Sequence, residues 1–174
     1  MIWILILGII VLGFGFVIFF GAPYVPSQRK FVRRAFENLY KVTAKDVLVD
    51  VGSGDGVVLR VAAEMGARAV GYEIHPFFVL LSRFLSRGNT NVTVKLANFW
   101  QVSLPNDTTI VYIFSVNRDG KKIMRKMQQE ADRLQKKLSL MCHGNPLPGM
   151  KSEKSFEAYH LYTFHPLQSS QAQV

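Results

Sequence analysis

The stretch VLVDVGSGDGVVL, residues 47–59, constrains the fold more than any other part of the chain. An apolar, β-branched run ends at Asp50, and glycines follow at positions 52, 54 and 56. Glycine lets a chain turn sharply and approach a ligand closely, so this order predicts a strand, a tight turn and then a helix. The start of that helix favours a negative group. The stretch therefore predicts an α/β fold with a ligand-binding loop after its first strand.

Strand and helix patterns alternate through the rest of the chain. We predict helices over residues 28–41, 57–66, 76–88 and 119–137, and strands over residues 46–51, 67–74, 91–99, 108–116, 138–143 and 159–164. This alternation is typical of βαβ units, so we expect a doubly wound, mostly parallel sheet with helices on both faces. The segment between Cys142 and Tyr159 is short and broken by Pro and Gly, so we expect the C-terminal strands to be abbreviated.

The start of the chain has the pattern of a membrane anchor. Residues 2–20 carry no charged side chain, and a helix of about 20 apolar residues spans the hydrocarbon core of a bilayer. No Lys or Arg precedes this run, and bulky Phe19 and Phe20 close it, which favours an uncleaved anchor over a signal peptide. Basic residues follow at positions 29–34. The positive-inside rule then predicts an outside N-terminus and a cytoplasmic domain.

Four parts are predicted along the chain. They are a transmembrane anchor (1–22), a juxtamembrane PYVP segment with a basic amphipathic helix (23–45), the α/β domain (46–166) and a disordered tail (167–174). The amphipathic helix, with Ser27 as a plausible N-cap, can pack on the domain through its apolar face. Its basic side chains can face anionic headgroups.

The composition of the chain is compatible with several kinds of binding partner. The net charge of +9 suits membrane headgroups, nucleic acid or an acidic substrate, and a solubilising basic surface explains it equally well. The basic helix over residues 119–137 motivates RNA binding, although a solvated helix face is the commoner cause of such a pattern. Cys142 is the single cysteine, so no intramolecular disulfide can form and a buried thiol is expected. No zinc-ligand cluster is present in the sequence, and no metal site is predicted.

The spacing of the glycines selects the cofactor class. A dinucleotide fingerprint needs a third glycine where Val57 stands, and a P-loop needs a G-K-[ST] that the chain lacks. The pattern D-x-G-x-G-x-G, which begins at Asp50, instead resembles the signature loop of class I S-adenosylmethionine-dependent methyltransferases. The resemblance extends from about residue 46 to residue 164. It implies a Rossmann-like sheet of seven strands and S-adenosyl-L-methionine as the cofactor.

The resemblance also implies a set of cofactor-binding residues at the strand ends. Glu73 would bind the ribose hydroxyls, since a carboxylate can accept both hydrogen bonds. Ile74 would pack on the adenine, and Asn98 would accept from the adenine amino group. The full set is Asp50, Gly52, Ser53, Gly54, Asp55, Gly56, Glu73, Ile74, Asn98 and Phe99. Without a ligand, the same glycines form a tight turn, Glu73 is a surface acid and Asn98 is a turn former.

The stretches APYVPS, DVGSGDG, GYEIHP and NFW narrow the resemblance. They are similar to the single-span protein-lysine methyltransferases, which include enzymes that modify the ATP synthase c-subunit and the adenine nucleotide translocase. This resemblance implies a lysine of a membrane or membrane-associated protein as acceptor, with the domain in the cytoplasm or, in mitochondria, on the matrix side. No N-P-P-[YF] motif is present, so a nucleic-acid substrate is not expected. A small-molecule or lipid methyltransferase and a non-catalytic cofactor-binding membrane module remain alternatives.

The residues that handle the acceptor are the least defined. A lysine nucleophile must be neutral, and desolvation lowers its reference pKa of about 10.4. Ser115, Asn117 and Asp119 lie at or just after the end of the fourth predicted strand, near the expected methyl site. Tyr24 of the PYVP segment could line the acceptor channel. Ser115, Asn117 and Tyr24 are the predicted catalytic residues, although loop chemistry explains them equally well. His75 precedes a proline and is expected on the adenosine side.

Overall fold

The computed structural model describes residues 2–4, 8 and 27–167, and its centre is one sheet of seven strands. The strand order is β3-β2-β1-β4-β5-β7-β6. The strands are β1 (Val47–Val51), β2 (Arg68–Glu73), β3 (Val92–Leu96), β4 (Ile110–Ser115), β5 (Leu138–Gly144), β6 (Lys154–Phe156) and β7 (Tyr159–Phe164). Strands β1 to β5 run parallel to one another, whereas β7 runs antiparallel to both β5 and β6. The α/β sheet predicted from the sequence is therefore confirmed.

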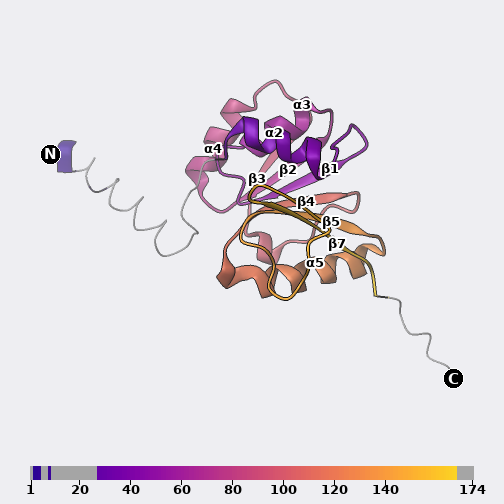
Figure 1. The fold of residues 1–174 in the computed structure, drawn as a ribbon. Helices are drawn as coiled ribbons and strands as arrows, with labels where there is room; N and C mark the ends of the chain where they lie inside the picture. The colour runs from indigo at the N-terminus through magenta and orange to yellow at the C-terminus, as the bar shows by residue number, and fades with distance from the viewer. Residues whose placement is uncertain (1, 5–7, 9–26, 168–174) are drawn as a thin grey trace.

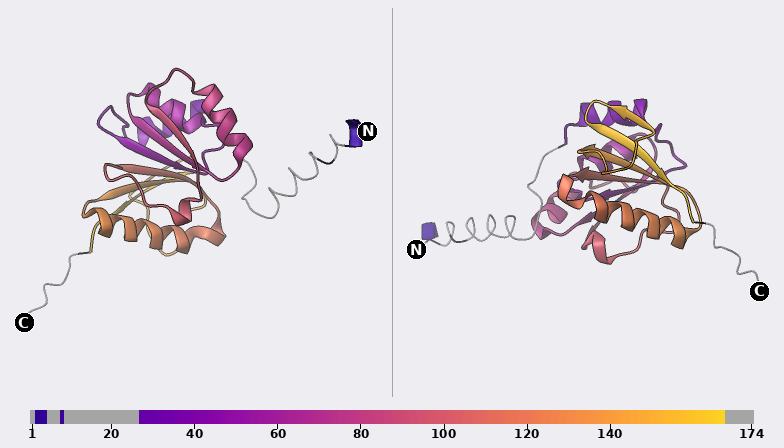
Figure 2. Two further views of the ribbon diagram at one scale, coloured as in Figure 1. Left: turned by 180° about the vertical axis from the view of Figure 1, so that it is seen from behind. Right: turned by 60° about the horizontal axis from the view of Figure 1, so that its bottom comes forward.

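Helices cover both faces of the sheet, as predicted. On one face lie α2 (Arg29–Asn38), α3 (Val57–Glu64) and α4 (Pro76–Leu85), and on the other lies α5 (Gly120–Leu134) (Figures 1 and 2). Two short 3₁₀ helices, η1 (Phe99–Gln101) and η2 (Asn117–Asp119), follow β3 and β4. All parallel strands end at one edge of the sheet, which we call the carboxyl edge. The connections that leave this edge position the candidate site.

Two apolar layers hold the helices to the sheet. Side chains alternate between the faces of a strand, so neighbouring residues enter different layers. In β1, Leu48 packs with Phe36 of α2 and Leu59 of α3, whereas Val49 packs with Ile123 and other residues of α5. These side chains are almost fully buried. The predicted inward faces of the helices over 28–41 and 119–137 are the faces that the structure buries.

The C-terminal part of the sheet corrects one prediction. The sheet is complete in strand number, because β6 pairs with β7 through the register Lys154↔Leu161 to Phe156↔Tyr159. Among the described residues, no helix lies between β5 and β6. The connection between these strands is therefore shortened, whereas the number of strands is not reduced. The β6 strand escaped prediction because it is three residues long, lies at the sheet edge and buries none of its side chains fully.

The start of α2 differs in a smaller way. The N-cap is Gln28, without a side-chain hydrogen bond, so Ser27 does not cap this helix. The Ser27 hydroxyl instead lies near the hydroxyl of Tyr112 in β4. The sequence pattern could not show this alternative partner, because Tyr112 is far away along the chain.

The predicted anchor falls almost wholly outside the described residues. Of the range 1–22, the structure describes only residues 2–4 and 8. Within residues 2–4, 8 and 27–167, no helix has the length and apolar character needed to cross a bilayer. The anchor therefore stays a prediction from the sequence. The predicted tail, residues 167–174, also lies outside the described residues apart from Leu167.

Candidate functional site

The loop between β1 and α3 owes its shape to glycine. Gly52, Gly54 and Gly56 have φ angles of +70°, +51° and +80°, a region that favours glycine. A Cβ atom on Gly52 would meet nothing within 4 Å, so open space lies beside the backbone there. A Cβ atom on Gly56 would lie 2.1 Å from Oγ of Ser82 in α4. Gly52 thus leaves room for a ligand, whereas Gly56 allows the close packing of α4.

Strand β2 fixes the position of this loop. The N–H groups of Gly52 and Ser53 donate to the Tyr72 carbonyl at 2.9 Å and 3.2 Å. A Cβ atom on Gly71 of β2 would lie 2.5 Å from Ser53 Oγ, so a glycine in β2 makes room for the loop. The loop is therefore attached to the strand next to β1 and does not project freely.

Glu73, at the end of β2, closes the loop from the other side. Its Oε2 atom accepts from the Gly54 N–H at 2.9 Å, and its Oε1 atom accepts from the His75 N–H at 2.8 Å. The side chain is buried. A carboxylate has about four lone-pair sites, so two remain for a ligand after these contacts. The sequence predicted Glu73 as a ligand group, and the structure adds that backbone hydrogen bonds orient its carboxylate.

Asp50, at the end of β1, is a deeply buried acid. Its side chain is 3% exposed, and no residue among those the structure describes donates a hydrogen bond to it. Burial raises the pKa of this carboxyl well above its ordinary value, and the nearby charges of Glu73 and Asp55 raise it further. A positive group placed here would favour the charged form of Asp50.

Asp55 and Ser53 complete the predicted loop residues. Asp55 Oδ1 accepts from the N–H of Val57 in the first turn of α3 at 3.3 Å, and its Oδ2 lies 3.6 Å from Nη2 of Arg60. Asp55 therefore also serves the start of α3. The Oγ atom of Ser53 is buried and makes no hydrogen bond with any residue in the described part of the chain.

The residues predicted for the adenine lie at the ends of β2 and β3. The Ala97 N–H donates to the Glu73 carbonyl at 2.9 Å, which joins the two strand ends. Ile74 is 37% exposed, whereas Phe99 is buried in the α5 layer. The Oδ1 atom of Asn98 accepts from the Trp100 N–H at 3.1 Å and so caps η1. Asn98 is thus a turn former in this structure, with one carbonyl lone pair left.

The predicted catalytic residues are less concentrated. Ser115, the last residue of β4, is almost fully buried, and its hydroxyl lies near the Cys142 thiol, whose pKa burial raises to about 12. Asn117 begins η2 and is exposed. Tyr24 lies outside the described residues. The structure brings the residues predicted to bind the cofactor together at the carboxyl edge. Their binding role and the catalytic roles of Ser115, Asn117 and Tyr24 stay predictions.

An aromatic cluster at the same edge was not anticipated from the sequence. It consists of Tyr112 and Phe114 of β4, His143 of β5 and Tyr159 of β7. The His143 ring stacks on Tyr159 with centroids 4.4 Å apart and contacts Phe114 edge-on at 5.3 Å. The Tyr112 and Tyr159 centroids are 6.4 Å apart. Because Tyr112 is the register partner of Asp50, the aromatic cluster begins directly beside the loop.

Polar atoms of the aromatic cluster are poorly satisfied. Burial lowers the pKa of His143, so the neutral ring is favoured, and its Nδ1 atom has no hydrogen-bond partner among the described residues. Burial raises the pKa of Tyr112 well above its ordinary value. The hydroxyls of Tyr159 and Ser27 lie near enough to influence that pKa, yet Tyr112 makes no hydrogen bond of ordinary geometry with a described residue. Buried polar atoms without partners are uncommon and often belong to functional sites.

One sequence signal could have indicated these residues. Tyr112 and Phe114 alternate along β4, so they share a face, and the two strands that follow in sheet order place His143 and Tyr159 opposite each other. The pairing of His143 with Tyr159 depends on the antiparallel register of β7. Sequence patterns alone do not give that register.

Comparison with known proteins identifies relatives with one common activity. No family model matches the chain. It is 34% identical over 111 residues to an ATP synthase c-subunit lysine N-methyltransferase of Xenopus laevis, covering 62% of this chain and 48% of that protein. It is 31% identical over 113 residues to a protein-lysine N-methyltransferase of Saccharolobus islandicus (strain REY15A), covering 62% of this chain and 69% of that protein.

Among solved structures, the fold resembles an RNA methyltransferase from Salinibacter ruber in complex with S-adenosyl-L-homocysteine. The TM-score is 0.69 at 24% identity, covering 80% of this chain and 92% of that one. At this identity the likeness concerns the fold alone. The chain spans about half the length of the ATP synthase c-subunit lysine N-methyltransferases it matches.

Proposed function

The chain belongs to the protein-lysine N-methyltransferase family, and from this we propose that it is an S-adenosylmethionine-dependent methyltransferase that modifies a lysine of a membrane or membrane-associated protein. The observation that carries the proposal is the group formed by the glycine loop, Asp50 and Glu73 at the carboxyl edge. Ligands of doubly wound sheets bind at this edge. The names of the relatives support lysine as the acceptor.

The described residues fit S-adenosyl-L-methionine. Glu73 keeps lone pairs for the two ribose hydroxyls, and the open space at Gly52 admits a ligand close to the backbone. The buried carboxyl of Asp50, which accepts no hydrogen bond from a described residue, suits a cofactor that carries positive charge. Ile74 offers an apolar surface to the adenine, and Asn98 offers its remaining carbonyl lone pair. When bound, the cofactor supplies an activated methyl group on a sulfonium.

The aromatic cluster is our candidate for the acceptor side of the site. Its aromatic rings would shield the lysine side chain from water, which lowers the pKa of the amine and favours the neutral nucleophile. Neutral His143 is a group that can take the released proton. Aligning the amine with the methyl group and excluding water is the main task left to the protein. Ser115, Asn117 and Tyr24 remain candidates for positioning the acceptor.

The cellular setting is also part of the proposal. We propose that residues 1–22 form a single transmembrane anchor with its N-terminus outside and the methyltransferase domain in the cytoplasm, or on the matrix side in mitochondria. The uncharged run over residues 2–20 and the basic residues at 29–34 support this orientation. The bilayer and the membrane-embedded substrate would then be the partners.

Cofactor binding is the first test. The full chain, purified in detergent, is titrated with S-adenosylhomocysteine in a calorimeter. We expect saturable binding that is strongly weakened in Glu73→Ala. Unchanged affinity in this variant would contradict the assignment of the cofactor site.

Methyl transfer is the second test. The enzyme and cofactor labelled in the methyl group are added to membranes from a strain that lacks the protein, and labelled products are separated and identified. Methyl-lysine in one protein band supports the proposal, and Glu73→Ala serves as the inactive control. Label in the lipid extract would favour the lipid methyltransferase, and label that resists protease but not RNase would contradict a protein acceptor. Cofactor binding without transfer to any membrane fraction would favour a non-catalytic module.

A further inference from the structure

The outer side of α4 exposes large apolar side chains to solvent. Phe77, Leu80 and Phe84 are 61%, 66% and 61% exposed, and their spacing places them along one side of the helix. Leu85 is 45% exposed and widens this surface. We call these four residues the α4 apolar face. Contiguous exposed apolar surface on a folded domain usually marks an interaction site.

The α4 apolar face lies beside the candidate site. Helix α4 packs on β3, the edge strand of the sheet, and starts directly after the loop that follows β2 (Figure 1). Ile74 and Leu96 are exposed at the carboxyl ends of β2 and β3, next to Glu73 in sequence and in register. Apolar surface therefore continues from α4 to the edge where the cofactor is proposed to bind.

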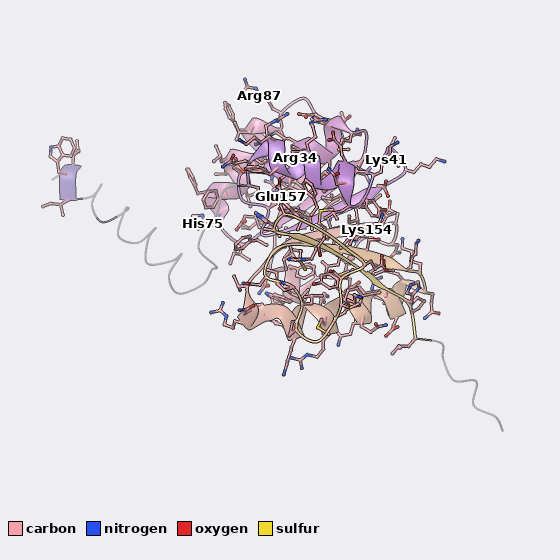
Figure 3. All side chains as sticks on the ribbon, in the orientation of Figure 1. Arg34, Lys41, His75, Arg87, Lys154 and Glu157 are labelled. Atoms are coloured by element: carbon pink, nitrogen blue, oxygen red, sulfur yellow. The ribbon has the colours of Figure 1, made fainter. Side chains whose placement is uncertain are left out.

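The charges around this surface are positive. No acidic residue occurs between Glu73 and Asp107. The guanidinium of Arg87 lies over the Phe84 ring, 4.4 Å from its centroid, and Figure 3 shows His75 and Arg87 at the two ends of α4. Arg83 of α4 is also exposed, and its guanidinium donates to the Val94 carbonyl of β3 at 3.0 Å and 2.7 Å. An apolar stripe with basic residues and no acids is the composition of surfaces that bind anionic membranes.

Helix α2 makes a useful contrast. Its basic residues were expected to face headgroups, but Arg29 and Arg33 both pair with Glu64 of α3, and Arg34 pairs with Glu157. Its apolar side is buried against the sheet. In α4, apolar side chains point outward and the neighbouring cations have no acidic residue close in sequence. Among the described helices, α4 is therefore better suited than α2 to lie on a membrane.

We propose that the α4 apolar face inserts into the interfacial region of an anionic lipid bilayer, with Arg83 and Arg87 at the level of the headgroups. The uncharged segment at residues 2–20 precedes the described domain by a few residues and would keep the domain within reach. Contact through α4 would then hold the carboxyl edge near the membrane surface. The consequence for substrate choice, a lysine presented at that surface, rests on the proposed function, whereas the membrane contact does not.

Depth-dependent quenching tests the contact directly. The full chain carries Leu80→Cys labelled with an environment-sensitive fluorophore, and Gln129→Cys, exposed on α5 at the opposite face, is the matched control. The native Cys142 is buried and its pKa is raised to about 12, so it competes poorly for the label at neutral pH. Both variants are reconstituted in phosphatidylcholine vesicles with about 30% phosphatidylglycerol, with and without brominated acyl chains.

Lipid contact predicts loss of about half of the fluorescence at position 80 in brominated lipid, since interfacial helices bury their apolar face about 5–10 Å deep. The label at position 129 is expected to stay unquenched. Arg87→Glu, or pure phosphatidylcholine, is expected to reduce the quenching at position 80. Equal, weak quenching at both positions would overturn the proposal. Residues 1–22, a second copy or another protein would then be what covers α4. Calorimetric titration of the same variants with S-adenosylhomocysteine shows separately whether the cofactor assignment fails.

Discussion

The two ends of β1 carry acids of opposite character. Asp46, just before the strand, is 9% exposed and accepts hydrogen bonds from Tyr40, Thr43 and Thr109 at 2.7–2.9 Å. Burial alone would raise the pKa of this carboxyl, but these hydrogen bonds outweigh burial and hold its pKa below the ordinary value. Asp50, four residues later, is buried more deeply, has no such donors in the described chain, and its pKa is raised.

The same contrast holds for the two edges of the sheet. Near the amino ends of the strands, Glu130 accepts from Lys126, Arg133 and the Leu104 N–H, and these contacts outweigh burial and lower its pKa. At the carboxyl edge, several buried polar atoms have no described partner instead, among them those of Ser53, Tyr112, Ser115 and His143. One edge is built for stability, and the other keeps hydrogen-bonding capacity for a ligand.

Gly56→Ala should have the largest effect on folding. The added Cβ atom would lie 2.1 Å from Ser82 Oγ at a φ angle of +80°, so strain and overpacking together should cost about 3 kcal/mol. Denaturant unfolding measures this loss. The control is Gly52→Ala, where the Cβ atom meets open space and only backbone strain of about 1 kcal/mol is expected. Adding Ser82→Ala to Gly56→Ala should recover part of the loss, and no recovery would contradict the steric explanation.

Glu73→Ala should have the largest effect on ligand binding. It removes the acceptor proposed for two ribose hydroxyls and the contact that holds the Gly54 N–H. Two hydrogen bonds to a charged group predict roughly 100-fold weaker binding of S-adenosylhomocysteine by calorimetry. Glu73→Gln keeps the shape and one carbonyl acceptor, so its loss should be intermediate. Equal losses in both variants would indicate that charge, and not hydrogen bonding, dominates.

Asp46→Asn tests the acid before β1, whose carboxylate accepts several hydrogen bonds. An amide cannot accept at both of its terminal atoms, so we expect a loss of about 2 kcal/mol in unfolding free energy at neutral pH. The folded pKa is below the unfolded one, so the wild-type contribution is present above the unfolded pKa of about 3.9 and is lost as pH falls through the folded pKa. Denaturation curves from neutral to acidic pH should therefore converge for wild type and variant. A difference in unfolding free energy between wild type and variant that stays constant with pH would contradict this link between stability and the Asp46 pKa.

Asp50→Asn should have the smallest effect on stability and the opposite sign. The folded pKa is above the unfolded one, so the wild type loses stability as pH rises from the unfolded pKa to the folded pKa. The neutral amide avoids this loss, and a gain of about 1 kcal/mol is expected at neutral pH, with no gain at acidic pH. The affinity for S-adenosylmethionine should rise with pH over the same range in the wild type and stay flat in the variant. Marked destabilisation of the variant would show that Asp50 has an unrecognised structural partner.

The sequence predicted the residues whose roles follow from local order. The glycine loop was predicted from the local sequence pattern, and the role of Glu73 from the resemblance to methyltransferases. Both lie at one edge because parallel strands bring their carboxyl ends together there. The capping role of Asn98 was weighed as its alternative, and the hydrogen bond to Trp100 lies within two residues. The partner of Asn98 is close in sequence, and the strand order alone brings the glycine loop and Glu73 to the same edge.

The features that escaped prediction depend on long-range pairing. The stacking of His143 on Tyr159 needs the antiparallel register of β7, and β6 is too short to show a pattern. The proximity of Ser27 to Tyr112 requires α2 to be placed on the sheet. The exposure of Phe77 and Leu80 depends on which side of α4 packs on the sheet, and the predicted helix over residues 76–88 does not give that side.

The hydrogen bond from the Gly54 N–H to Glu73 joins residues 19 positions apart, and both of its partners belong to the protein itself. The loop is thus preorganised: its conformational entropy is lost during folding and not during cofactor binding, which favours tighter association. Binding should then follow single-step kinetics, without a slow loop-closing phase. The Gly54 amide should also exchange slowly with deuterium before any cofactor is added.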